Sequence, residues 1–176
     1  MNIFLRDLAR KAEWHFGKSD PRSLLRAFFS DGTCEMFIYR LMWLFDKQRL
    51  VPLVLFFAWF NGALNKIVIG RHADFGPGFV ILHSCGVVIN SAVKGGKNIV
   101  IENGVTIGAR ENQSPKLGDN IYIGAGAKII GGVTIGDNVK VGANAVVTKD
   151  VPSDCTVVGI PAKIVRLKGE RVELPL

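Results

Sequence analysis

The sequence has few of the residues that build metal, disulfide or nucleotide sites. Its 176 residues include only three cysteines and three histidines. Cys34, Cys85 and Cys155 lie far apart and show no CxxC spacing, which argues against a disulfide framework and a zinc knuckle and favours a reducing compartment. No GxSxG elbow and no GxxxxGK[ST] loop is present, so hydrolases of that type and P-loop nucleotide enzymes both lack their motifs.

Long runs of like charge are also missing, although the chain is basic. The formal net charge is +7 and the isoelectric point is near 9.5, which suits an anionic partner such as a nucleic acid, a membrane surface or a phosphorylated small molecule. The basic residues are scattered and do not alternate with aromatic residues as a single-stranded nucleic acid site requires. We therefore expect no nucleic acid partner.

No apolar run is long enough to cross a bilayer. The longest, LVPLVLFFAWFNGAL at residues 50–64, falls short of the ~20 residues needed and is interrupted by Pro52, Asn61 and Gly62. We expect it to form a helix that is buried against the main domain or a partner subunit. A contact with the membrane interface is the alternative. The basic residues that would assist such a contact are Arg40, Lys47 and Arg49.

Residues 1–66 are rich in Leu, Phe, Trp and Arg, poor in Gly, and patterned at helical spacing. Two helices are predicted. One begins within SDPRSLLRAFF, with Ser19 or Asp20 as N-cap and Pro21 at the first helical position, and another follows Pro52. The opening MNIFLRDLARKAEWHF lacks the continuous apolar segment of a signal peptide. We expect a cytoplasmic protein, with peripheral contact to the inner membrane as the alternative.

A six-residue period begins at Ile69 and is clearest in the second half of the chain. An apolar residue opens each hexad, Gly often follows it, and a small or β-branched residue stands four positions after the first. The opening residues are Leu117, Ile123, Ile129, Ile135, Val141 and Val147, and their partners are Ile121, Ala127, Val133, Val139, Ala145 and Val151.

Neither an α-helix nor an ordinary alternating strand has a period of six. The period fits a coil with flat sides, in which each hexad makes one short strand and one corner. The first and fifth residues of each hexad then point inward, and Gly or Asn at the corners supplies the positive φ angles of the turns. The sequence therefore predicts a mainly β protein, a parallel β-helix at residues 67–166, preceded by the helical region and followed by a tail at residues 167–176.

The period is interrupted twice. The spacing from Ile81 to Ile89 is eight residues, so two extra residues enter near LHSCGVV, and the spacing from Ile107 to Leu117 is ten, so ARENQSPK is expected to form a protruding loop. Four residues after Ile81 stands Cys85, which we expect to point inward as an inert core residue.

Only one of the three histidines occupies an irregular place in the repeats. His83 falls at an outward corner beside the two-residue interruption, where an accessible imidazole is expected of a functional site. His72 sits at a corner within regular repeats, and His15 lies in the helical region. We interpret both as structural.

Several longer segments resemble the hexapeptide-repeat acyltransferases, specifically the serine acetyltransferase group. They are ILHSCGVVIN, IENGVTIGA, SPKLGDNIYIGAGAKIIGGVTIGDNVKVGANAVVTKDVP and VVGIPAKIVR, within residues 69–166. The resemblance implies a left-handed β-helix that assembles as a homotrimer, with a dimer of trimers as a further option. It also implies acetyl coenzyme A (acetyl-CoA) as the acyl donor and no metal.

The resemblance also assigns site residues. His83, in HSCG, matches the catalytic histidine, which acts as general base on the acceptor hydroxyl. The expected coenzyme A (CoA) site consists of Gly124, Ala125, Gly126, Ala127, Lys128, Gly142, Ala143, Lys163 and Arg166, of which the three cations would bind the phosphates. The expected acceptor-binding residues of the loop are Arg110, Glu111 and Ser114.

Two positions depart from the serine acetyltransferase pattern. Those enzymes typically have Asp before the catalytic histidine and His before the loop proline, where this chain has Leu82 and Ser114. We therefore expect a saccharide acceptor, as in the related enzymes of exopolysaccharide or capsule biosynthesis, with serine as the alternative. A non-catalytic scaffold is a further alternative. A γ-carbonic anhydrase-like zinc enzyme would need three histidines in the repeat region, which holds only His72 and His83.

The loop at residues 109–116 yields a first prediction. Exchanging it for the loop of a relative with a known acceptor should change acceptor preference, because the loop is expected to contact the acceptor, and should leave acetyl-CoA binding nearly intact. Initial rates with two acceptors and a binding assay for acetyl-CoA would check this. Loss of both properties together would show that the loop has a different role.

Overall fold

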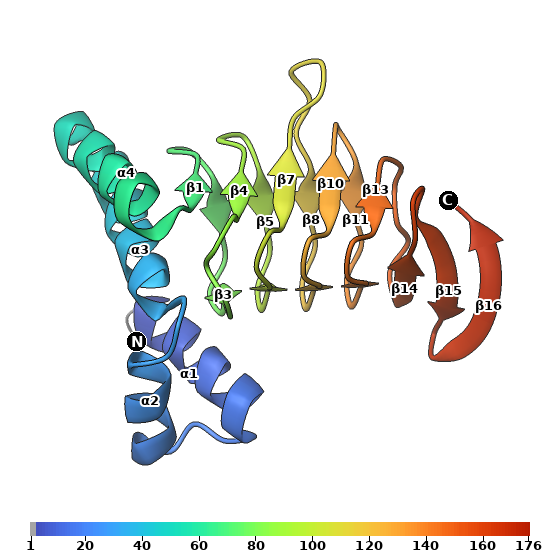
Figure 1. Cartoon of the computed structure of the whole chain (residues 1–176), viewed down its shortest axis with the longest axis horizontal. Helices are drawn as coiled ribbons and strands as arrows, with labels where there is room; N and C mark the ends of the chain where they lie inside the picture. The colour runs from blue at the N-terminus through green and yellow to red at the C-terminus, as the bar shows by residue number, and fades with distance from the viewer. Residues whose placement is uncertain (1–2) are drawn as a thin grey trace.

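The computed structural model describes residues 3–176, apart from the side chains of residues 64 and 65. Four helices precede a three-sided β-helix (Figure 1), whereas the sequence predicted two. They are α1 (Ile3–Phe16), α2 (Pro21–Phe28), α3 (Thr33–Lys47) and α4 (Val51–Asn65). Asp20 is the N-cap of α2, since its carboxylate accepts a hydrogen bond from the Ser23 amide.

The β-helix is a triangular prism whose three sides are sheets of short strands, mostly parallel. The first sheet contains β1 (Val68–Ile69), β4 (Val88–Ile89), β7 (Thr106–Gly108), β10 (Lys128–Ile130) and β13 (Val146–Val147). The second contains β2 (Asp74–Phe75), β5 (Lys94–Gly95), β8 (Lys116–Leu117) and β11 (Thr134–Ile135). The third contains β3 (Val80–Ile81), β6 (Val100–Ile101), β9 (Tyr122–Ile123), β12 (Lys140–Val141), β14 (Cys155–Val158), β15 (Lys163–Leu167) and β16 (Glu170–Pro175).

The strand register follows the six-residue period. Val88 pairs with Thr106, 18 residues later, as three hexads per coil require. The partner of Val68 is Val88, 20 residues later, because the coil between them contains the two-residue interruption. The partner of Thr106 is Lys128, 22 residues later, because the loop enters that coil. The inward residues of the hexads, Gly95 aside, are buried and form the core.

Cys85 does not point inward, so that prediction was wrong. Its side chain is exposed, and Val87 is the buried residue that completes the coil after Ile81. The two extra residues enter before the fifth position of this hexad and shift the inward position from 85 to 87. The interruption therefore lies at residues 82–86, which form the corner that carries His83.

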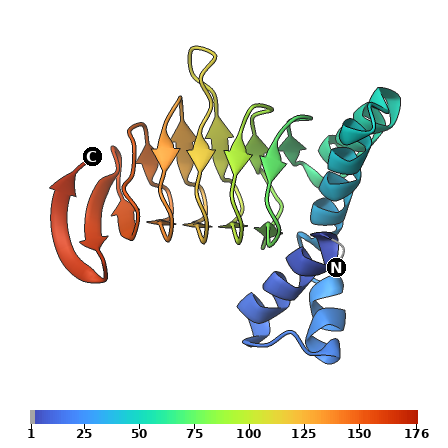
Figure 2. The same cartoon turned by 180° about the vertical axis from the view of Figure 1, so that it is seen from behind.

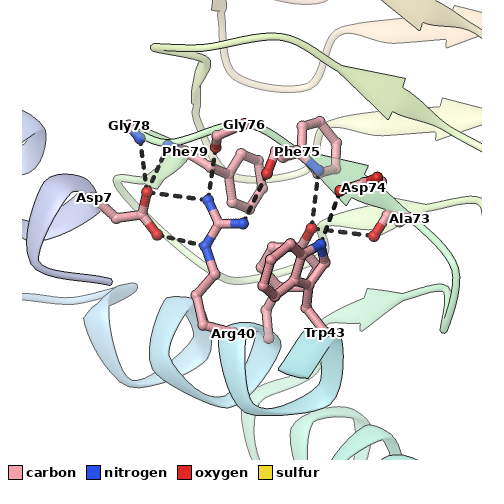
Figure 3. A network of polar contacts seen from close by, with 10 residues as sticks. Asp7, Arg40, Trp43, Ala73, Asp74, Phe75, Gly76, Gly78 and Phe79 are labelled. Atoms are coloured by element: carbon pink, nitrogen blue, oxygen red, sulfur yellow. Dashed lines mark hydrogen bonds and ion pairs between the residues drawn. The ribbon is translucent and has the colours of Figure 1, made fainter. Parts of the chain in front are cut away.

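A network of buried polar contacts docks the helices on the first coil (Figure 3). Arg40 of α3 pairs with Asp7 of α1 through Nε–Oδ2 and Nη2–Oδ1 contacts of 2.6 and 3.0 Å. The same guanidinium donates to the carbonyl oxygens of Phe75 and Gly76, and the Asp7 carboxylate accepts from the amides of Gly78 and Phe79 in the same corner. Buried charges are tolerated only when paired and hydrogen-bonded in this way.

Helix α4 is only partly buried in the single chain, so its burial against a partner subunit stays a prediction. It packs along α3 at one end of the prism, but Leu53, Leu55, Phe56 and Trp59 remain exposed in the single chain. Arg40 is committed to Asp7, so it is not available for the membrane contact considered above. In residues 3–176 no helix is long and apolar enough to cross a membrane.

The far end of the β-helix is covered by antiparallel strands. Strand β15 pairs with β14, and β16 pairs with β15, so residues expected as a tail extend the third sheet, as Figure 2 shows from behind. Both open ends of the prism are thus covered, one by helices and one by a hairpin.

The buried ion pair yields a stability prediction. Arg40→Ala should lower the free energy of unfolding by about 3–5 kcal/mol, because the Asp7 carboxylate would stay buried without its partner. Arg71→Ala is the matched control, since Arg71 pairs with Asp46 in a partly exposed site, and it should cost less than about 1 kcal/mol. Urea unfolding would measure both. Equal losses for the two variants would contradict this account.

Candidate active site

His83 lies at the corner that follows β3, and its side chain is 59% exposed, as expected. Its Nδ1 lies 3.0 Å from Oδ2 of Asp31, in the turn between α2 and α3. The Ser84 hydroxyl donates a longer bond of 3.4 Å to Oδ1 of the same carboxylate. Because Nδ1 faces the carboxylate, Nε2 is the ring nitrogen that remains to accept a proton.

A buried lysine holds the turn of Asp31 against the β-helix. The Lys11 ammonium donates to the main-chain oxygen of Asp31 and, at 2.9 Å each, to Thr33 Oγ1 and the Ile81 carbonyl. Gly32 packs directly on this strand end at φ 80°, where a Cβ atom would collide with the Ile81 carbonyl oxygen. The turn and the end of β3 are therefore joined through one lysine.

A group of side chains beside His83 had not been predicted. Helix α1 brings Trp14 onto Tyr122 in a stacked pair, with ring centroids 5.2 Å apart, and the Tyr122 hydroxyl donates to Glu102 at 3.3 Å. Burial, followed by neighbouring positive charge that includes His83, lowers the pKa of His15, and Glu102 opposes this shift. His15 therefore lies within electrostatic reach of His83.

The small residues expected to bind the donor share one edge of the prism with His83. Residues 124–127 follow β9, and residues 142 and 143 follow β12, just as His83 follows β3. Residues 124–127 lie two coils from His83, roughly 10 Å at the spacing of neighbouring strands. Gly126 has φ 72°, and a Cβ atom there would collide with the Asn144 side chain, so packing of the coils also requires small residues along this edge.

The three cations expected to bind the donor phosphates are not brought together. The Lys128 ammonium donates to the Gly104 carbonyl at 2.6 Å. Lys163 lines a cavity of about 140 Å³ near the C-terminal strand. Arg166 lines a different groove of about 370 Å³ on the third sheet. In the single chain, Lys163 and Arg166 therefore face separate surfaces.

The expected acceptor residues lie at another edge of the prism. Arg110, Glu111 and Ser114 belong to the loop between β7 and β8, which stands on the side of the coil opposite α1 (Figure 1). The Ser114 hydroxyl donates to Asn90 Oδ1 at 2.9 Å. Within one chain the loop is thus held by its own corner, away from His83.

A second histidine–aspartate pair occurs at a different corner. His72 Nδ1 lies 2.9 Å from Asp46 Oδ2, and the Arg71 guanidinium also binds this carboxylate, at 2.8 Å. His72 and His83 thus contact separate aspartates. Within residues 3–176 no three His, Cys, Asp or Glu side chains gather closely enough to hold a metal ion.

Comparisons with known proteins agree with this architecture. Residues 114–149 match the family described as bacterial transferase hexapeptide (six repeats). A serine acetyltransferase from Synechococcus elongatus is 42% identical over 135 residues, which cover 74% of this chain and 55% of the relative. The curated relative from Staphylococcus xylosus is 46% identical over 57% of this chain and 48% of its own. The chain therefore spans about half the length of the curated relatives that it matches.

Solved structures match nearly the whole chain. Serine acetyltransferase from Neisseria gonorrhoeae in complex with serine has a TM-score of 0.81 and 30% identity, covering 92% of this chain and 68% of that one. The Brucella abortus enzyme in complex with CoA has a TM-score of 0.82 and 26% identity, covering 96% and 68%. The fold is that of a left-handed β-helix acyltransferase. The chain belongs to the hexapeptide-repeat acyltransferase family, in the group that contains the serine acetyltransferases.

The buried lysine yields a pH prediction. Burial lowers the pKa of Lys11 from 10.5 to about 8, against the charges of Asp31 and Glu35. Between about pH 8 and 10.5 the unfolded chain therefore holds more protons at this site, so the contribution of Lys11 to the free energy of unfolding should rise with pH. Urea unfolding of wild type and Lys11→Met at about pH 7.5 and about pH 9.5 would measure it. A difference that is constant or falls with pH would contradict the assignment.

Proposed function

We propose that the chain is an acetyl-CoA-dependent O-acetyltransferase in which His83 is the general base. The observation that carries the proposal is the His83 imidazole, exposed at a corner of the prism with Nδ1 against Asp31. The edge that carries His83 also carries the small residues expected to accommodate the donor. Membership of the acyltransferase family and the CoA complex of a structural relative support the same chemistry.

The proposed reaction is a direct transfer within a ternary complex. Nε2 of His83 takes the proton of the acceptor hydroxyl as its oxygen attacks the thioester carbonyl carbon. Backbone N–H groups near the corner would stabilise the oxyanion that develops. The carbon–sulfur bond then breaks, and the imidazolium returns the proton to the sulfur of CoA. The products are the acetyl ester and free CoA.

Serine is the acceptor that the relatives favour. The curated relatives and the matching structures are serine acetyltransferases, and one of the structures is a complex with serine. The comparisons therefore support the serine reading, which the sequence analysis gave as the alternative, better than the saccharide reading that it preferred.

A saccharide hydroxyl is the second candidate, because two observations favour it. Leu82, buried beside His83, and Ser114 replace polar residues that are typical of serine acetyltransferases. The partly exposed Trp14–Tyr122 stack and the Glu102 carboxylate form a surface with an aromatic face and a hydrogen-bond acceptor, which are the groups that contact a sugar ring and its hydroxyls.

A homotrimer would complete the site. His83 and the loop of Arg110, Glu111 and Ser114 lie at different edges of one prism, so side-by-side packing of prisms would bring the loop of one subunit toward the histidine edge of its neighbour. The exposed apolar side chains of α4 would then be available for pairing of trimers. A light-scattering mass near three times that of the chain would agree with this arrangement.

The test is release of CoA from acetyl-CoA with L-serine and with a panel of sugars and oligosaccharides. His83→Ala should lower kcat by about 100-fold or more, because the general base is lost. His72→Ala is the matched control, since His72 also pairs with an aspartate at a corner, and its activity should stay within about twofold of wild type.

Turnover on serine would support serine as the acceptor. Turnover on a saccharide alone would support a saccharide hydroxyl as the acceptor. Undiminished activity of His83→Ala would refute the base assignment. A wild-type chain that neither binds acetyl-CoA nor releases CoA would leave a scaffold role as the better account.

A further inference from the structure

We infer that Asp31 is the positioning residue for His83 and that the helical region, rather than the β-helix, supplies this carboxylate. The inference rests on the proposed function, because it assigns a partner to the proposed base. Its geometric part, the orientation of the imidazole, can be tested without any enzymatic assay.

Both oxygens of the Asp31 carboxylate contact the corner that carries His83. Oδ2 of Asp31 lies 3.0 Å from His83 Nδ1, and Oδ1 accepts the longer bond from Ser84. The residue directly before His83 is the apolar, buried Leu82. A carboxylate at that corner therefore has to come from another element, and the turn between α2 and α3 provides one.

The position of this turn is determined by the same strand end that precedes the histidine. Lys11 bridges the main-chain oxygen of Asp31 and the carbonyl of Ile81, two residues before His83. Gly32, the next residue of the turn, leaves no space for a side chain against Ile81. The main-chain segments that carry the carboxylate and the imidazole are thus held together at the end of β3 by buried contacts, although both side chains are exposed.

The chemical consequence concerns which nitrogen of His83 carries the proton. A carboxylate is an acceptor only, so it holds the hydrogen on Nδ1 and leaves Nε2 with its lone pair, as a general base requires. When Nε2 takes the acceptor proton, the negative charge of Asp31 stabilises the imidazolium. Asparagine at position 31 could instead donate to Nδ1, which would favour the tautomer with hydrogen on Nε2.

The first experiment measures the tautomer by ¹⁵N NMR of histidine-labelled protein above the pH at which the ring is charged. The chain has three histidines, and His15→Gln and His72→Gln would assign the His83 signals. Wild type should show mainly hydrogen on Nδ1, and Asp31→Asn should move the population toward hydrogen on Nε2. An unchanged tautomer in Asp31→Asn would overturn the inference, whether or not the chain acetylates any acceptor.

The second experiment measures kinetics with the acceptor identified above. Asp31→Asn should lower kcat by about tenfold or more with KM for acetyl-CoA within about twofold, and Asp31→Glu should recover part of the loss because it restores the carboxylate. A merely structural residue would not separate the effect on kcat from the effect on KM in this way.

Asp46→Asn is the matched control, because Asp46 makes an equivalent contact with His72 at another corner. It should leave kcat and the KM for acetyl-CoA within about twofold of wild type. Equal effects of Asp31→Asn and Asp46→Asn would overturn the inference. Absence of acetyltransferase activity in wild type would instead remove the proposed function, and the NMR result alone would then decide whether Asp31 orients His83.

Discussion

The contact between the helices and the first coil is the constraint on which the rest of the site depends. Arg40 and Asp7 neutralise each other in a buried position and together bind main-chain groups on either side of the corner between β2 and β3. Neither residue is satisfied unless α1, α3 and the first coil meet. This mutual dependence fixes α1 and α3, and with them the turn between α2 and α3 and its Asp31.

The same docking explains why other side chains of α1 reach the surface near His83. One turn after Asp7, Lys11 reaches the end of β3, and one turn later the helix brings Trp14 onto Tyr122 of β9. Helix α1, which the sequence analysis did not predict, therefore contacts the third sheet from β3 to β9. Its polar and aromatic side chains become part of the surface around His83.

The sequence was sufficient to predict a flat-sided β-coil and its two interruptions, because the inward residues recur every six positions, and the family resemblance implied the left-handed β-helix. It placed His83 outward at the first interruption for the same reason. Cys85 was misplaced because the period does not reveal where within a hexad the extra residues enter. The Asp31 contact joins residues 52 positions apart, and it depends on the docking of helices whose number was itself underestimated. No local pattern carries that information.

The relatives and the local chemistry differ in what they favour as acceptor. The overall similarity to serine acetyltransferases favours serine, whereas Leu82 and Ser114 depart from the serine acetyltransferase pattern. The difference concerns only the acceptor side, since the proposed base and donor edge are common to both readings. The fold therefore determines the reaction class more strongly than it determines the substrate.

The central claim is that Asp31 acts through His83, and a double-mutant cycle tests it most directly. The kcat/KM for CoA release would be compared among wild type, Asp31→Asn, His83→Ala and the double variant. If the carboxylate acts only by orienting the base, the double variant should match His83→Ala within about twofold. A loss from Asp31→Asn that is as large in the His83→Ala background as in wild type would contradict the account.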